Sequence, residues 1–384
     1  MPELDTIFEQ LRETVEDMSF PSVRNWLGEH PGGKVGVHFQ VYFPEEIVAA
    51  GGMLPLKVMG ASGYVEAKQA DSRFASFICS ICRTSLELGL SGRLDFMSAF
   101  VTHPICDAAR NMAGVWGRNF PEQLTQILYL PQNANSRYAP QYLRDEYNRL
   151  KGDLERLCGH PITDDDLRRS IEVYNENRRL LRELYRLRRD APWLLSMVES
   201  YILTRAGTAM PREAHNAILR EVLALLPERS RRKQDRPRVV FEGGFCEQPP
   251  IDMLLTLDES VYVVDDDLLI GSRWILDDVP TAGDPLMNLA IYYLEHSTYS
   301  PVQHDARKPK ERMLLERIRG AGAEAAIVSA AKMCEPGLDE QVAYQKALEQ
   351  ENVPYLILEF EEKMSAFEQM KMQVETFVES ILFD

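Results

Sequence analysis

Two stretches of this chain alternate short apolar runs with helical segments, and this alternation constrains the fold more than any other feature of the sequence. Strands of this length that alternate with helices are typical of parallel sheets whose faces are covered by helices. The first stretch lies before residue 141 and the second after residue 236. The runs that we predict to be strands are Val35 to Phe43, Leu54 to Met59, Phe96 to Thr102, Gln126 to Leu130, Arg238 to Glu242, Val261 to Val264, Ala325 to Ser329 and Tyr355 to Glu359.

The sequence between these two stretches has a helical period. Leucines recur among many Arg and Glu residues at positions 150, 154 and 157, and again at 180, 184 and 187. From about Gln141 to Pro227 this spacing predicts helices, and the acidic turn Thr163 to Asp166 is a good N-cap for the second of them. We therefore expect an α/β chain of two Rossmann- or flavodoxin-like parallel-sheet domains (residues 1–140 and 237–384) with an all-helical insertion between them (residues 141–236).

Composition limits the partners of the chain. Its formal net charge is -16 at pH 7, from 43 Lys and Arg against 59 Asp and Glu. So acidic a protein is a poor binder of nucleic acid or of anionic membranes, and we expect neither as a partner. The basic run from Arg229 to Lys233 could be a nucleic-acid patch, but we interpret it as a solvated linker because the whole chain is acidic.

The sequence also bears on the compartment. It has no run of roughly 18 apolar residues that could span a bilayer. The acidic, amphipathic segment MPELDTIFEQ lacks the positive start and apolar run of a signal peptide. We expect a cytoplasmic protein, in which cysteines are reduced thiols or metal ligands.

Three cysteines stand in the same kind of position. Cys79, Cys106 and Cys334 each lie just past an apolar run and open a predicted helix. Because ligands bind at the carboxyl ends of parallel strands, we expect the three thiols at that edge, where a helix N-terminus favours the thiolate. Three thiolates could hold an iron–sulfur cluster with one iron open for chemistry. The alternative is that they are buried cysteines that act as small hydrophobes.

A local repeat supports an arrangement in two halves. In both α/β stretches a strand, a short loop, a cysteine with an acidic neighbour and a helix follow in that order, with Cys106-Asp107 in the first and Cys334-Glu335 in the second. We interpret this as two related halves that face each other.

The remaining cysteines have weaker signals. Cys82 forms a Cys-x-x-Cys with Cys79, so it could be a redox partner, a further ligand or only a neighbour of the cluster. Cys158 lies in the helical block and is interpreted as structural. Cys246 follows a predicted strand end, which is a weak ligand signal.

The sequence contains no Gly-x-x-x-x-Gly-Lys-Ser/Thr loop, so we do not expect this chain to bind ATP by that motif. Neither a His-x-x-x-His pair nor a Ser-His-Asp pattern is evident. His38, His103 and His296 each stand alone in the sequence, outside any paired motif, and we interpret each as structural.

Several motifs resemble those of one known family. They are Ile78-Cys79-Ser80-Ile81-Cys82-Arg83-Thr84-Ser85-Leu86, Cys106-Asp107, Val264-Asp265-Asp266-Asp267-Leu268 with Gly271-Ser272-Arg273, and Cys334-Glu335-Pro336. In this order, and over nearly the whole chain, the sequence resembles the subunits of the 2-hydroxyacyl-CoA dehydratases and benzoyl-CoA reductases. Chain length and the Cys-x-x-Cys-Arg form are most similar to the gamma (C) subunits of ATP-dependent benzoyl-CoA reductases.

The resemblance implies a function for the chain. It implies a [4Fe–4S] cluster held by Cys79, Cys106 and Cys334, a homologous cluster-bearing partner subunit, and separate ATPase (activator) subunits that share a [4Fe–4S] cluster and deliver electrons from ferredoxin. The implied reaction is the reduction of benzoyl-CoA to cyclohexa-1,5-diene-1-carbonyl-CoA. Two other functions stay open, namely a 2-hydroxyacyl-CoA dehydratase subunit that eliminates water through a ketyl radical, and a non-catalytic subunit that only relays electrons.

Other roles follow only as candidates. Glu247 and His103 are possible proton donors. Arg83 and Arg273 could bind the phosphates of CoA or order the cluster loops, and ordinary surface ion pairing is the alternative for both.

Overall fold

The protein is built around two four-stranded sheets, in both of which every pair of neighbouring strands is parallel. The computed structural model describes residues 2–39, 42–61, 63–243, 249–268, 275–298, 303, 305, 307–364 and 366–383. The strands of the first sheet are β1 (Val35–Phe39), β2 (Leu54–Val58), β3 (Met97–Thr102) and β4 (Leu124–Ile127), and those of the second are β5 (Arg238–Gly243), β6 (Tyr262–Asp266), β7 (Ala325–Ala331) and β8 (Tyr355–Phe360). The predicted fold class is confirmed.

The two sheets have the same topology. The strand order is β2-β1-β3-β4 in the first sheet and β6-β5-β7-β8 in the second. In each sheet the second strand in sequence lies on one side of the first strand, and the third and fourth strands follow on its other side. Every residue of β1, β6 and β7 is buried, as expected for parallel strands covered by helices on both faces. The interpretation of two related halves agrees with this common order.

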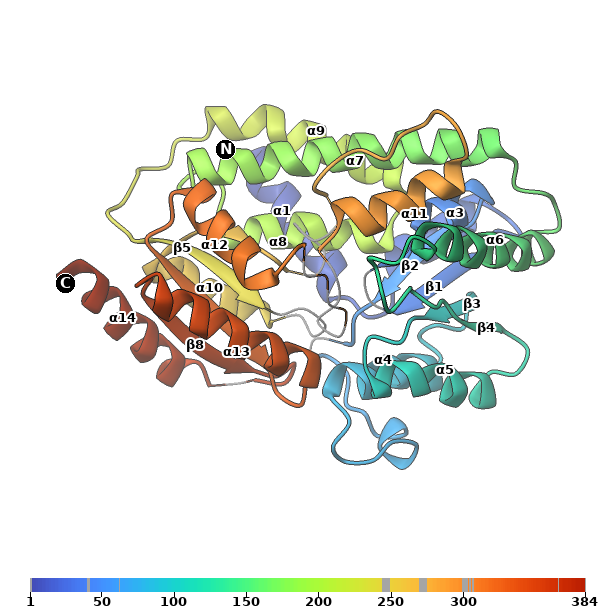
Figure 1. Cartoon of the computed structure of the whole chain (residues 1–384), viewed down its shortest axis with the longest axis horizontal. Coiled ribbons are helices and arrows are strands. Elements are labelled where there is room, and N and C mark those ends of the chain that lie inside the picture. The colour runs from blue at the N-terminus through green and yellow to red at the C-terminus, as the bar shows by residue number, and fades with distance from the viewer. Residues whose placement is uncertain are drawn as a thin grey trace.

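Helices surround both sheets and fill the region between them in sequence (Figure 1). They are α1 (Pro2–Glu16), α2 (Pro21–Glu29), α3 (Glu45–Ala50), α4 (Ser80–Leu90), α5 (Asp107–Asn119), α6 (Ala139–Cys158), α7 (Asp164–Asp190), α8 (Met197–Ala206), α9 (Arg212–Leu225), α10 (Ile251–Ser260), α11 (Pro285–His296), α12 (Lys310–Ala321), α13 (Glu335–Gln350) and α14 (Glu368–Phe383), with short 3-10 turns at Ala70–Ser72, Gly207–Ala209 and Leu226–Glu228. In the described part of residues 141–236 all regular elements are helical.

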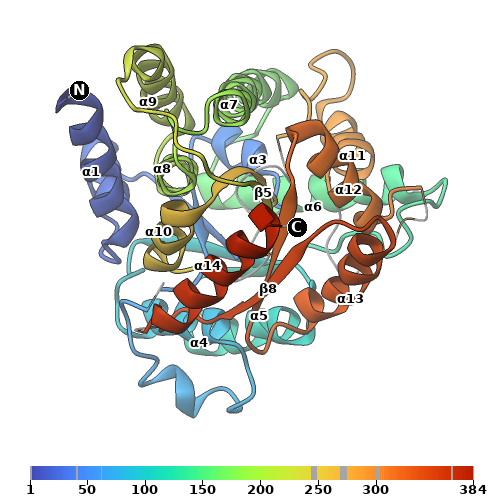
Figure 2. The same ribbon diagram turned by 90° about the vertical axis from the view of Figure 1, so that its left-hand side faces the viewer.

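Helix α7 connects the two sheet regions. It is 27 residues long and runs along the top of the molecule above both sheets (Figures 1 and 2). Its buried Arg178 forms an ion pair with Glu46 of α3, and its buried Arg188 forms one with Asp266 of β6. Helix α7 is therefore fixed to both halves of the protein by buried charges.

A capping box begins helix α7, as the acidic turn predicted. The Thr163 hydroxyl accepts a hydrogen bond from the Asp166 N–H at 3.2 Å, and the Asp166 carboxylate accepts one from the Thr163 N–H at 2.8 Å. We expect Thr163→Ala to lower the free energy of unfolding by about 1 kcal/mol, because one N–H at the helix start loses its acceptor. Urea denaturation followed by circular dichroism measures this, with Thr14→Ala, inside α1, as the matched control; equal unfolding midpoints for both variants would contradict the prediction.

Among the helices that the structure describes, none is both long and apolar enough to cross a bilayer.

Candidate functional site

The three predicted ligands are the N-cap residues of three helices. Cys79 precedes α4, Cys106 precedes α5 and Cys334 precedes α13. Cys106 follows β3 and Cys334 follows β7, and these two strands hold the same position in the order of their sheets. The repeated unit noted in the sequence therefore brings one cysteine from each half to the carboxyl edge of its sheet.

Local geometry explains why these cysteines suit helix starts. The backbone of Cys106 is extended, and its sulfur accepts a hydrogen bond from the Ala109 N–H at 3.3 Å, as the side chain of an N-cap residue does. Before Cys334, Met333 has a φ of 63°, a left-handed conformation that turns the chain sharply from β7 into α13. Both thiols therefore lie where unpaired N–H groups point out of a helix.

The thiols lie close enough to change one another's pKa. A hydrogen bond with the Cys82 thiol lowers the pKa of Cys79, whereas burial and the charge of Cys334 act to raise it. Burial is the main cause that raises the pKa of Cys106 to about 12, and the charges of Cys79 and Cys334 act in the same direction. The hydrogen bond with Cys79 and burial raise the pKa of Cys82 well above its usual value. The structure therefore gathers four cysteines from two sheets into one region.

The three cysteines are chemically suited to bind a metal cluster through their thiolates. In the described part of the chain no three His, Cys, Asp or Glu side chains form a group that could hold a metal ion as they stand. Cys79, Cys106 and Cys334 supply soft sulfur donors, and each lies at the positive end of a helix dipole, which stabilises an anionic group. The ligand assignment stays a prediction.

An open cleft lies beside Cys106 and has a volume of about 580 Å³. Ile105, Tyr129 and Pro336 form part of its wall. Its charged residues are Asp107, Arg110, Glu335 and Asp339. A benzene ring needs about 150 Å³, so an aromatic acyl group fits this volume, but the excess of carboxylates disfavours phosphate groups in it.

Of the other candidate residues, the structure describes Arg83 but not Arg273, Cys246 or Glu247. Arg83 lies in α4 and donates a hydrogen bond to Asp71 at 3.0 Å, so the alternative of ordinary ion pairing describes its contact. Cys246, Glu247 and Arg273, together with Gly271 and Ser272 of the quoted motif, lie outside the described residues. The contacts of Arg273 therefore stay a prediction.

His103 is buried at the end of β3, three residues before Cys106. Its ring contacts Tyr42 edge-on at 5.7 Å between centroids. Burial lowers its pKa to about 3, so the imidazole is neutral near pH 7. A neutral imidazole can relay a proton between other groups, but it does not hold an additional proton that it could donate as an imidazolium.

Glu362 connects the two halves near the cysteines. It follows β8 of the second sheet, yet its carboxylate accepts hydrogen bonds from the Ala61 N–H at 2.9 Å and from the hydroxyl of Thr84, in α4, at 2.8 Å. Its charge also acts on the Cys79 thiol. Sequence reasoning missed this residue; its signal in the sequence was the pair Glu361-Glu362 after the apolar run of β8.

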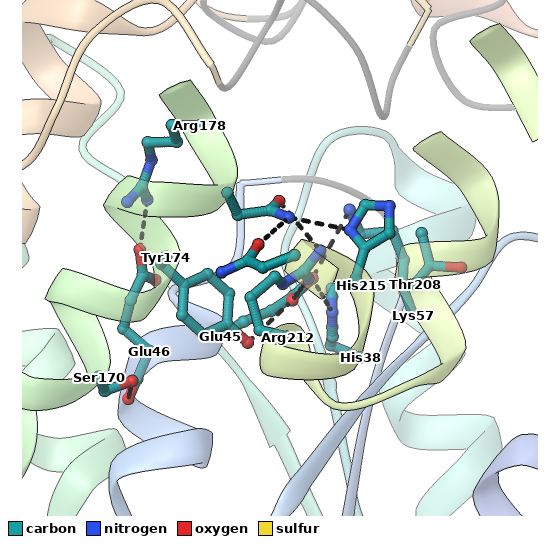
Figure 3. A network of polar contacts seen from close by, with 12 residues as sticks. His38, Glu45, Glu46, Lys57, Ser170, Tyr174, Arg178, Thr208, Arg212 and His215 are labelled. Atoms are coloured by element: carbon teal, nitrogen blue, oxygen red, sulfur yellow. Dashed lines mark hydrogen bonds and ion pairs between the residues drawn. The ribbon is translucent and has the colours of Figure 1, made fainter. Parts of the chain in front are cut away.

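A buried polar network between the first sheet and the helical region was also missed (Figure 3). At its centre is Glu45 of α3, which interacts with His38 at 3.1 Å, with the Tyr174 hydroxyl at 3.2 Å and with the Arg212 guanidinium. Lys57 Nζ lies 3.7 Å from the same carboxylate. Single charges in the sequence do not reveal such partners, because Tyr174 and Arg212 are more than 100 residues away from Glu45.

Comparison with known proteins agrees with this architecture. A family model described as 2-hydroxyglutaryl-CoA dehydratase, D-component, matches residues 40–381. The chain is 38% identical over 368 residues to the benzoyl-CoA reductase C subunit of Thauera aromatica, which covers 95% of both chains. It is 30% identical over 383 residues to the lactoyl-CoA dehydratase beta subunit of Anaerotignum propionicum, which covers 99% of this chain and 100% of the relative.

A third relative, the (R)-2-hydroxyglutaryl-CoA dehydratase beta subunit of Acidaminococcus fermentans, is 30% identical over 346 residues, which cover 88% of this chain and 90% of the relative. The chain belongs to the 2-hydroxyglutaryl-CoA dehydratase D-component family. The predicted family is thus confirmed, and relatives with both reductase and dehydratase names are similar to this chain over nearly its whole length.

Proposed function

We propose that this chain is an iron–sulfur subunit of a dearomatising benzoyl-CoA reductase. The observation that carries the proposal is the convergence of Cys79, Cys106 and Cys334, each at the start of a helix and drawn from both sheets. The similarity to a benzoyl-CoA reductase C subunit, at 38% identity, favours this activity over the dehydratase activity named for relatives at 30%. The names of these relatives also support a heteromeric complex.

In this proposal Cys79, Cys106 and Cys334 hold a [4Fe–4S] cluster. When bound, the cluster would supply electrons of low potential, one at a time, for a net reaction in which benzoyl-CoA takes up two electrons and two protons and becomes cyclohexa-1,5-diene-1-carbonyl-CoA. Ferredoxin would provide the electrons. Separate ATPase subunits would couple their transfer to ATP hydrolysis, which agrees with the missing ATP loop in this sequence.

The side chains around the thiols have defined tasks in this proposal. Ala109 donates its N–H to the sulfur of Cys106, which stabilises the thiolate. Ile105 and Ala109, on either side of Cys106, are buried, which limits the access of water from that side, and exclusion of water protects a strongly reducing centre. The cleft beside Cys106 suits the acyl end of the substrate, and its carboxylates direct the CoA phosphates elsewhere.

The first test is iron and acid-labile sulfide content, with EPR of the reduced protein purified without oxygen together with its partner subunits. We expect about four iron atoms per chain for a [4Fe–4S] cluster and loss of this iron in Cys106→Ala and Cys334→Ala. Cys158→Ala, a thiol at the end of α6, is the matched control and should retain the iron. An iron-free wild type would refute the cluster.

Turnover separates the candidate functions. A reductase consumes reductant in proportion to benzoyl-CoA, whereas a dehydratase eliminates water from a 2-hydroxyacyl-CoA without net consumption. Activity on a 2-hydroxyacyl-CoA alone would overturn the reductase proposal in favour of the dehydratase.

The electron-relay alternative rests on Cys82, which is fully buried next to Cys79 and could complete a four-thiolate set. Unchanged spectra and activity in Cys82→Ala would exclude Cys82 as a ligand and remove the reason for this alternative.

A further inference from the structure

A small cavity of about 50 Å³ is lined by several residues of the polar network shown in Figure 3. It lies where the carboxyl ends of β1 and β2 meet helices α7 and α9. His38, Lys57, Tyr174, Arg178, Thr204 and Arg212 form part of its lining. None of the roles proposed above for the cysteines uses this cavity.

The buried charges around the cavity do not balance. Lys57, Arg178 and Arg212 supply three cations, whereas Glu45 and Glu46, their ion-pair partners, supply two anions. Burial lowers the pKa of the adjacent His215 to about 3, so this ring is neutral. With Lys57 protonated, one positive charge is in excess over these residues. Burial lowers the pKa of Lys57 and the charge of Glu45 acts to raise it, so an anion beside Lys57 would favour its charged form. A buried charge without a counter-ion is costly, so the site favours an anion.

Two donors next to this excess charge are available for a ligand. Lys57 Nζ lies 3.7 Å from Glu45 Oε1, which is too long for a hydrogen bond. The buried Nε of Arg212 has no hydrogen-bond partner among the described residues. Arg212 donates to Glu45 through its Nη2, so its Nε remains free to bind a second oxygen.

The volume restricts what can bind. A water molecule needs about 10–15 Å³ on this scale, and a cavity that holds benzene measures about 150 Å³. A volume of about 50 Å³ therefore holds three or four heavy atoms and excludes an aromatic ring. Formate and acetate have three and four heavy atoms, and their carboxylates match the geometry of an arginine.

The ligand also has a route of entry. Tyr174 and Arg212 line the cavity and also an outer cleft of about 690 Å³ that contains Trp26, His30 and Arg169. Arg212 lies over the Tyr174 ring at 4.8 Å, so the two side chains that the cavity and the cleft share are in contact with each other. Movement of these two side chains would open the cavity to the outer cleft.

We propose that this cavity binds a small carboxylate anion of the size of formate or acetate, held by Lys57 and Arg212. The site is separate from the cysteines and from an aromatic acyl group, so it goes beyond the proposed reductase function. A ligand with so few atoms binds no more tightly than about 0.05 mM.

The test measures binding of ¹³C-formate and ¹³C-acetate to the full-length chain, purified anaerobically with its partners, by NMR line broadening up to about 100 mM. Sodium pivalate, whose anion is too large for the cavity, keeps the ionic strength constant. We expect saturable binding of formate and acetate, and a dissociation constant raised about 10- to 100-fold in Lys57→Met, since a charge-assisted hydrogen bond is lost. The control Lys371→Met removes an exposed lysine that pairs with Glu259 and should bind as the wild type does.

Three outcomes would overturn the proposal: no saturable binding by the wild type, equal binding of pivalate, or unchanged affinity in Lys57→Met. If Lys57→Met does not fold, Thr204→Ile replaces it, because it fills the cavity without altering a charge. If Thr204→Ile bound formate and acetate as tightly as the wild type does, the anion would bind outside this cavity, and the proposal would be wrong.

Discussion

Replacement of Arg188 by methionine is expected to lower the free energy of unfolding by about 3–5 kcal/mol. Arg188 is fully buried in α7, and its Nη2 donates to Asp266 Oδ2 at 2.6 Å. The Tyr185 hydroxyl donates to the other oxygen at 2.9 Å. Without Arg188 the Asp266 carboxylate stays buried and loses its ion-pair partner, while the Tyr185 hydroxyl and the Leu268 N–H, at 3.1 Å, are neutral donors. A buried charge that loses its ion-pair partner is far more costly than a lost surface pair.

The matched control is Arg186→Met in the same helix. Arg186 is exposed and pairs with Glu183 and Asp190, so its loss should leave the urea midpoint close to that of the wild type. The double variant Arg188→Met with Asp266→Asn removes both charges and should recover part of the lost stability. If Arg188→Met unfolded at the same urea concentration as Arg186→Met, the account of α7 as a buried connection between the two halves would be wrong.

The strands were predictable because parallel strands buried on both faces leave continuous apolar runs in the sequence. All eight predicted runs overlap an observed strand. The ends were less accurate. The run predicted for Val35 to Phe43 ends as a strand at Phe39, and the run predicted for Gln126 to Leu130 is a strand over Leu124–Ile127. Apolar character continues past a strand end when the loop is buried, so composition does not mark the end.

Helix α11 (Pro285–His296) was not predicted. It packs against α6 and α7, and most of its residues are buried, so no polar face reveals a helical period. Its start carried a signal nevertheless: Asp284 accepts the N–H of Leu286 at 3.0 Å as an N-cap, and Pro285 occupies the first turn.

The cysteines were predictable as helix starts because strand, loop and helix signals are local. Their gathering into one region depends on how the two halves pack, which the sequence indicated only through the repeated unit. The buried ion pairs were not predictable, since Glu45 and Arg212 are 167 residues apart and each looks like an ordinary surface charge. The basic run from Arg229 to Lys233 shows the same limit: Arg229 is buried and pairs with Glu199, so the interpretation of a fully solvated linker was wrong for this residue.

Glu362→Ala is the second substitution with a large expected effect. The Glu362 carboxylate accepts hydrogen bonds from the Ala61 N–H and the Thr84 hydroxyl across the two halves, and hydrogen bonds to a buried charged group contribute about 1.5–3 kcal/mol each. Their loss should lower the free energy of unfolding by about 3 kcal/mol or more and leave two donors without this acceptor. Urea denaturation measures the stability, and limited proteolysis near residues 60–66 measures local opening.

Glu361→Ala is the matched control at the neighbouring position, because Glu361 is exposed and pairs only on the surface with Lys332 among the described residues. Glu362→Gln keeps one carbonyl acceptor and should lie between Glu362→Ala and the wild type. Since Cys334 belongs to one half and Cys79 to the other, loosening this contact should also speed the loss of iron from a cluster bound by both. Iron that was retained as long in Glu362→Ala as in Glu361→Ala would show that the cysteines are held together without Glu362, whatever the change in stability.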